Sequence, residues 1–186
     1  MKNLIILSFA LLALSSANGQ GCLPEGITLE TQAEIDSFQI NYPGCTEIEG
    51  DMTINGSDIT NLNGLITLNS IGGNLVIGTD GWNANPVLEY LTGLDNLVST
   101  GGDLTINSNS ILKNLSGLDN LTAVNGNLSI SNNPLLNDIS DLGLLNSIGG
   151  NLQIGFQGWT GIPYGNPSLV SLAGLEGITS LAGLQL

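Results

Sequence analysis

The sequence contains no histidine and almost no basic side chains, and these shortages exclude several classes of function. Among 186 residues, Lys and Arg number 2 against 16 Asp and Glu, a formal net charge of −14. Nucleic acids and anionic membranes would be repelled by such a chain, so we expect neither as a partner. Lys113 is the one basic side chain after Lys2, and it sits in a regular stretch. We therefore expect no catalytic residues, no metal ligands, no cofactor and no enzyme activity.

Long apolar runs are also missing. The longest, residues 4–14, follows Lys2 and falls short of the roughly 20 residues that a membrane-spanning helix needs. A basic start, a short apolar core and small residues after it are typical of a secretory signal peptide. We assign residues 1–19 to a signal peptide and expect no membrane span. Lipid attachment at Cys22 is an alternative, but residues 19–21 lack the aliphatic side chain usual in lipoprotein signals.

Cysteine is scarce too, with Cys22 and Cys45 the only two. In an exported chain they are free to form a disulfide. Between them, Thr31-Gln-Ala-Glu34 has the spacing of a capping box, which starts a helix. We expect residues 20–47 to form an N-terminal cap with this helix and the disulfide.

The abundant feature is an internal repeat of about 24 residues. Each copy contains an apolar residue followed by x-G-x-L-x-I, and the copies begin at Ile48, Ile71, Thr100, Val124 and Ile148. We expect Leu-x-Ile to form one strand per repeat with its middle residue facing outward, and successive strands to stack into a parallel sheet. The outward residues are Thr53, Val76, Thr105, Ser129 and Gln153.

Between these strands an apolar residue recurs at every third position, as in Leu112, Leu115, Leu118 and Leu121. A period of three gives no apolar face on an α-helix and does not fit strand alternation. It suits a chain that winds around a narrow interior. We predict a mainly β, right-handed parallel β-solenoid over residues 48–186, with about five coils and an incomplete sixth that implies a longer natural chain.

Two polar positions also recur in the repeat. Asparagine returns at one bend, where its side chain is expected to satisfy backbone groups; these residues are Asn85, Asn109, Asn133 and Asn166. Asp or Asn returns just before each strand, which favours a short polar turn residue over a calcium site; these residues are Asp51, Asn74, Asp103, Asn127 and Asn151.

Cys22 and Cys45 around the capped helix, followed by coils of the form L-x-x-L-x-G-L-x-x-L-x-x-I-x-G-x-L-x-I, resemble the receptor L domain. The resemblance is closest to bacterial secreted proteins that carry such leucine-rich domains, and it covers roughly residues 22–186. It implies extracellular recognition or adhesion. The chain departs from the receptor examples in its few cysteines.

Two insertions, residues 78–86 and 155–167, interrupt the regular coil and contain both tryptophans. Aromatic side chains on projecting loops can stack on a sugar or anchor a protein. The candidate ligand-binding residues are therefore Asp80, Trp82, Phe156, Trp159 and Tyr164. The alternative is that each tryptophan folds back over its own loop. The outward strand row is a second candidate surface, with an ordinary solvated sheet face as its alternative.

These features favour a secreted or cell-surface recognition or adhesion module whose partner is an extracellular protein or glycan. The first alternative is a passive structural spacer within a larger secreted protein. A carbohydrate-active enzyme is the third hypothesis.

Overall fold

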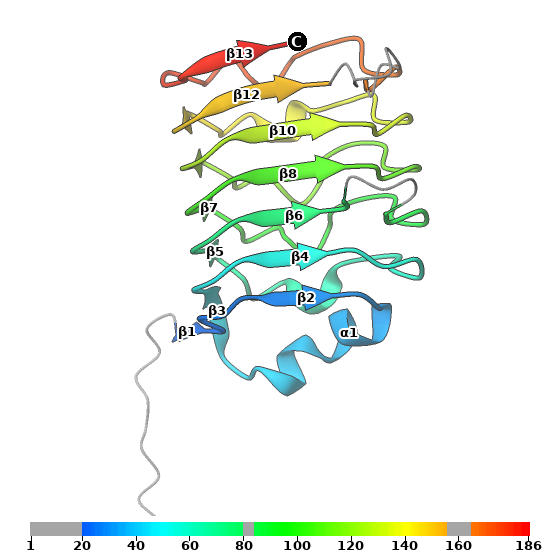
Figure 1. Ribbon diagram of the computed structural model, residues 1–186, viewed down its shortest axis with the longest axis vertical. Coiled ribbons are helices and arrows are strands. Elements are labelled where there is room, and N and C mark those ends of the chain that lie inside the picture. Colours follow the sequence, from blue (N-terminus) through cyan, green and yellow to red (C-terminus); the bar gives the residue numbers. More distant parts are fainter. Residues whose placement is uncertain (1–19, 80–83, 156–164) are drawn as a thin grey trace, which may run out of the picture.

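The computed structural model describes residues 20–79, 84–155 and 165–186, and this part of the chain forms two parallel β-sheets and one α-helix (Figure 1). The six-stranded sheet has the order β1-β3-β5-β7-β9-β11, and the seven-stranded sheet has the order β13-β12-β10-β8-β6-β4-β2. From β1 to β12, strands of one sheet alternate in sequence with strands of the other. The stack therefore grows by one strand in each sheet as the chain advances.

The seven-stranded sheet consists of β2 (Ile27–Leu29), β4 (Met52–Ile54), β6 (Leu75–Ile77), β8 (Leu104–Asn107), β10 (Leu128–Ser131), β12 (Asn151–Ile154) and β13 (Gly183–Gln185). The strands predicted at Leu-x-Ile are confirmed, and they pair in parallel with no slip between repeats: Leu104 lies beside Leu128, and Leu128 beside Leu152. The Leu and Ile of β6, β8, β10 and β12 point into the core while the residue between them faces outward.

The six-stranded sheet consists of β1 (Gln20–Cys22), β3 (Cys45–Ile48), β5 (Ser70–Ile71), β7 (Ser99–Thr100), β9 (Ala123–Val124) and β11 (Ser147–Ile148). The prediction of one strand per repeat was wrong, because the apolar residue that opens each repeat unit ends a second short strand. The two-residue strands β5, β7, β9 and β11 each bury only that one side chain, so alternation over four or more residues, the usual sequence sign of a strand, is missing.

Glycines join the two strands of each repeat, and their small size is what the tight stacking requires. A Cβ on Gly101 would collide with the carbonyl oxygen of Gly72 in the preceding repeat. In each repeat a segment runs back from the seven-stranded sheet to the six-stranded sheet, and we call it the return segment. Gly117, in one of these segments, has φ of +108°, a left-handed conformation that residues with a side chain disfavour. Glycine therefore serves two different purposes in the repeat.

The leucines at every third position line the core between the sheets, as predicted, except in the last repeat, where Leu172 is exposed. Leu112, Leu115, Leu118 and Leu121 are all fully buried, and so are their counterparts in neighbouring repeats. Short turns set this spacing, since the amide of Leu118 donates to the carbonyl of Leu115 and that of Leu121 to Leu118, each at 3.0 Å. Burying one leucine contributes about 2 kcal/mol, so neighbour contacts of this kind hold the stack together. The return segments also contain two 3₁₀ turns, η1 (Asn63–Leu65) and η2 (Ser140–Leu142).

The helix α1 (Gln32–Asn41) covers the first end of the stack (Figure 1). Its predicted capping box is confirmed: Thr31 accepts from the amide of Glu34, and the Glu34 carboxylate accepts from the amide of Thr31 at 3.0 Å. Ile35 and Phe38 are fully buried against the core. None of the described residues forms a helix with the length and apolarity needed to cross a membrane.

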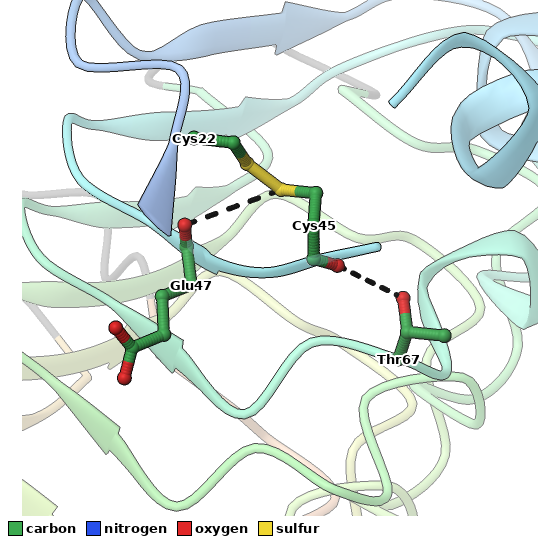
Figure 2. The surroundings of a disulfide bond; sticks show 4 residues. All are labelled: Cys22, Cys45, Glu47 and Thr67. Carbon is green, nitrogen blue, oxygen red and sulfur yellow. Dashed lines mark hydrogen bonds between the residues drawn. A yellow bond between two sulfur atoms is a disulfide. The ribbon is translucent and has the colours of Figure 1, made fainter. Parts of the chain in front are cut away.

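The segment assigned to the cap also begins both sheets, because β1 and β2 precede the helix. Cys22 at the end of β1 is joined by a disulfide to Cys45 at the start of β3, as predicted (Figure 2). The Cys45 carbonyl accepts from the Thr67 hydroxyl at 3.2 Å. Closing a loop of this length contributes about 3 kcal/mol by the loop-entropy estimate. A disulfide of this kind suits an oxidising compartment.

Candidate functional site

The five residues first chosen from the sequence, Asp80, Trp82, Phe156, Trp159 and Tyr164, lie outside the described residues, as do residues 1–19. The hypothesis that the insertions bind a ligand therefore remains a prediction. The second candidate, the outward row of the seven-stranded sheet, falls within the described chain. It is the surface that can be built from its side chains upward.

The strand register brings the outward row into a straight line. Thr105 lies beside Ser129, Ser129 beside Gln153, and Gln153 beside Gln185. These side chains come from β8, β10, β12 and β13, four neighbouring strands in Figure 1. Adjacent strands are about 4.8 Å apart, so the row presents one polar side chain at each such step. Gln185 extends the predicted row by one member beyond Gln153.

The side chains of this row make no hydrogen bonds to other parts of the described chain. Thr105, Ser129 and Gln153 are partly exposed, and Gln185 is exposed. Hydroxyl and amide groups can each donate and accept hydrogen bonds. The row is therefore available to an external partner without breaking an internal contact.

A hollow of about 580 Å³ lies over this part of the sheet. One side is the row itself, and the other is the column of polar residues that precedes the strands. Its lining is Asp103, Thr105, Asn127, Leu128, Ser129, Asn151, Gln153, Gly183, Leu184 and Gln185. We call this surface the sheet groove.

The Asp and Asn column at the edge of the groove forms a ladder of hydrogen bonds. The Asp103 carboxylate accepts from the amide of Asn127 at 2.7 Å, and Asn127 accepts in turn from the amide of Asn151 at 2.8 Å. The same bond joins Asp51 to Asn74 at 2.7 Å. The expectation of a turn residue at this position is confirmed. No group of three potential metal-binding side chains occurs within the described ranges.

A second ladder, formed by the recurring asparagines, is fully internal. Asn85, Asn109 and Asn133 are completely buried and Asn166 nearly so. The Asn109 amide group donates to the carbonyls of Ile77 and Asn107, at 3.0 and 3.1 Å, and its oxygen accepts from Asn85 at 2.9 Å. The prediction that these side chains satisfy backbone groups is confirmed. A row whose polar atoms are all used inside the fold has none left for a ligand, unlike the sheet groove.

The acidic side chains of the return segments also bind the backbone of this chain. Asp119 accepts from the amide of Gly117, and Asp141 accepts from the amide of Leu115, both at 3.0 Å. Burial raises the pKa of Asp141, and the nearby carboxylates of Asp119 and Asp138 raise it further. This cluster lies on the return segments, apart from the groove lining.

Lys113 is paired on the surface of the return segments. Its ammonium group forms an ion pair with Glu89 and lies 5.8 Å from the centre of the Tyr90 ring. Its amide also donates to the carbonyl of Glu89 at 3.1 Å. An exposed pair of this kind adds little stability. The pair joins two neighbouring repeats and lies outside the groove lining.

Another hollow, of about 550 Å³, lies at the last repeat. Its lining combines Ile154 and Leu169, which pack in or against the core, with exposed apolar side chains and with the polar residues Asn166, Ser171 and Gln185. Two of these three polar side chains are already used inside the fold, since Asn166 bonds to Asn133 and Ile130 and the Ser171 hydroxyl accepts a hydrogen bond from the amide of Ala173. The sheet groove is therefore the better candidate site in the described chain.

Sequence reasoning identified the row and the Asp/Asn column separately but did not bring them together. The signal was present, because the column residue precedes the row residue by two positions in every repeat, as Asp103 precedes Thr105. Comparison with protein-family models, with curated proteins and with solved structures gives no match. The candidate function therefore depends on the groove itself.

Proposed function

We propose that this chain is a secreted, leucine-rich β-solenoid of the receptor L domain type, and that it acts as an extracellular recognition or adhesion module. The proposal assigns the apolar core, the asparagine ladder and the capping helix to the scaffold. It assigns ligand binding to the sheet groove, and it includes no catalytic step. Export through a signal peptide at residues 1–19 is part of the proposal, and the disulfide between Cys22 and Cys45 is in keeping with it.

The observation that carries the proposal is the contrast between the groove and the rest of the repeat. Asn109 and its equivalents use their side-chain polar atoms inside the fold, whereas the side chains of Thr105, Ser129 and Gln153 make no hydrogen bond within the described chain. A solvated spacer surface needs no hollow, but here a hollow of about 580 Å³ spans the row. A concave surface with convergent polar groups is the usual form of a binding site.

The experiment is a binding screen with immobilised, purified protein against extracellular matrix proteins and polysaccharides. Any retained ligand is then tested with the triple variant Thr105→Val, Ser129→Ala and Gln153→Met, which removes the polar groups of the row and largely keeps side-chain size. The matched control is Ser70→Ala, Ser99→Ala and Ser147→Ala, on the outer face of the six-stranded sheet.

We expect the groove variant to lose binding and the control to keep it, with both unfolding at the urea concentration of the parent chain. A third variant, Trp82→Ala with Trp159→Ala, tests the insertions. If this tryptophan variant alone loses binding, the ligand binds at the insertions and not in the sheet groove. Failure of every ligand in the screen would favour the structural-spacer alternative.

A further inference from the structure

The groove presents its polar groups along a line that crosses the strands. Thr105, Ser129, Gln153 and Gln185 come from four adjacent strands, so their backbones span about 14 Å at the usual strand spacing. A partner that meets all four must be extended and must offer polar groups at a regular interval. We propose that the sheet groove binds a linear polysaccharide without acidic groups, lying across β8, β10, β12 and β13. This rests on the function proposed above.

The chemistry of the lining fits sugar hydroxyls. A hydroxyl both donates and accepts, and so do the side chains of Thr105, Ser129 and Gln153. The groove edge adds the side-chain amide of Asn151 and the second carboxylate oxygen of Asp103, which has no hydrogen bond inside the described chain. Each sugar can therefore meet a row residue on one side and an edge residue on the other.

The negative charge of the groove and of the whole chain disfavours acidic polysaccharides. Asp103 is the one ionised residue in the lining, and the chain as a whole has a formal charge of −14. A polymer of uronic acids or sulfated sugars would place its charges beside Asp103 within the same negative field. A neutral polymer meets no such repulsion.

The lining is a poor match for a protein partner. Protein interfaces concentrate their binding energy in Trp, Tyr and Arg anchors that fill apolar pockets. The lining contains none of these residues, Leu128 is completely buried, and Leu184 is the one exposed aliphatic side chain. The surface offers a regular set of hydrogen bonds in place of an apolar anchor point.

Isothermal titration of the full chain tests this proposal. The ligands are neutral β-linked glucose and N-acetylglucosamine oligomers, from disaccharide to hexasaccharide, with oligogalacturonates of equal length as the acidic comparison. We expect the neutral oligomers to bind, with affinity rising up to about four sugars, the number of strands that contribute to the row. Oligogalacturonates should bind at least about tenfold more weakly at low salt.

Single substitutions locate the binding. Thr105→Val and Gln153→Met should each weaken neutral oligomers about fivefold, the factor that one hydrogen bond of ordinary strength supplies. Ser70→Ala and Ser147→Ala on the other sheet should leave the affinity unchanged. Unchanged urea unfolding curves verify that the variants fold.

Equal binding of acidic and neutral oligomers would overturn the proposal, as would neutral binding that Thr105→Val and Gln153→Met leave unchanged. Suppose that no neutral oligomer binds but the groove variant loses affinity for a protein ligand found in the screen. The polysaccharide assignment then fails, while the assignment of ligand binding to the sheet groove stands. If no ligand of any kind responds to the groove variant, both fail.

Discussion

At the scale of single residues, asparagine performs two different tasks in the repeat. Asn127 stands at the groove edge and is exposed, while Asn133 is completely buried. Each side chain accepts a hydrogen bond from the backbone amide of the equivalent asparagine in a neighbouring repeat: Asn127 from Asn151 at 2.8 Å, and Asn133 from Asn109 at 3.0 Å. Only the buried row also donates to strand carbonyls, as Asn133 does to Ile106 at 3.0 Å. The two rows should therefore respond very differently to substitution.

Replacing Asn109 with Ala should destabilise the fold strongly. The change leaves the carbonyls of Ile77 and Asn107 without this donor and the amide of Asn85 without this acceptor. Unsatisfied buried groups cost 1–3 kcal/mol each, so we expect the free energy of unfolding to fall by about 3 kcal/mol in urea titrations. Asn137→Ala, at an exposed position, is the control and should change it by less than about 0.5 kcal/mol. Similar losses in both variants would contradict the role of the buried ladder.

Asp141 should make stability depend on pH. Burial and the carboxylates of Asp119 and Asp138 raise its pKa in the folded chain above the unfolded value of about 3.9. A raised pKa means that its favourable contribution is complete below about pH 3.9 and is lost as pH rises through the folded pKa.

Asp141→Asn keeps an oxygen to accept the Leu115 amide but cannot ionise. The free energy of unfolding of this variant, relative to the parent, should therefore be higher at pH 7 than at pH 3. Denaturant unfolding at both pH values measures the difference. A relative stability that falls from pH 3 to pH 7 would show that Asp141 is not destabilised by its neighbours.

At the scale of elements, the capping helix couples the N-terminus to the return side of the next repeat. The Gln32 side chain accepts from the amides of Thr60 and Asn61, at 2.7 and 3.2 Å, and Gln39 donates to the Gly64 carbonyl at 3.1 Å. The start of the helix depends on the capping box at Thr31.

Replacing Thr31 with Ala should remove the acceptor of the Glu34 amide and lower the free energy of unfolding by about 1 kcal/mol. Ile40→Ala is the matched control, because Ile40 is on the same helix and is 80% exposed. It should change stability by less than about 0.5 kcal/mol. Urea unfolding followed by circular dichroism measures both. A larger loss in the control would place the stabilising contact on the exposed face of the helix.

Elements with strong local signals were predictable from the sequence, and elements fixed by neighbours were not. The capping box and the period of three depend on residues close in sequence, and both are confirmed at Thr31 and along Leu112–Leu121. The second strand of each repeat has one inward side chain, such as Ile148, and exists because the adjacent repeat supplies its hydrogen bonds. The same holds for the sheet groove, which needs the register of neighbouring repeats before Asp103 and Gln153 line one hollow.

At the scale of the whole molecule, the proposed function places recognition on residues that the stability of the stack does not depend on. The core leucines, the buried asparagines and the tight glycines are fixed by contacts between neighbouring repeats. The outward row has no such constraint, and its members differ from repeat to repeat, from Thr53 and Val76 to Ser129 and Gln153. Variation on a regular frame is how repeat scaffolds acquire a binding surface. The negative charge of the chain then restricts the partners that can approach.

The most direct test of this account is an amide NMR titration of the isotope-labelled chain with the ligand that the binding screen retains. The account predicts that the largest shifts cluster on β8, β10 and β12, at Thr105, Ser129 and Gln153, together with the groove edge at Asn127 and Asn151. Shifts confined to the insertions at residues 78–86 and 155–167, or to the six-stranded sheet, would contradict it.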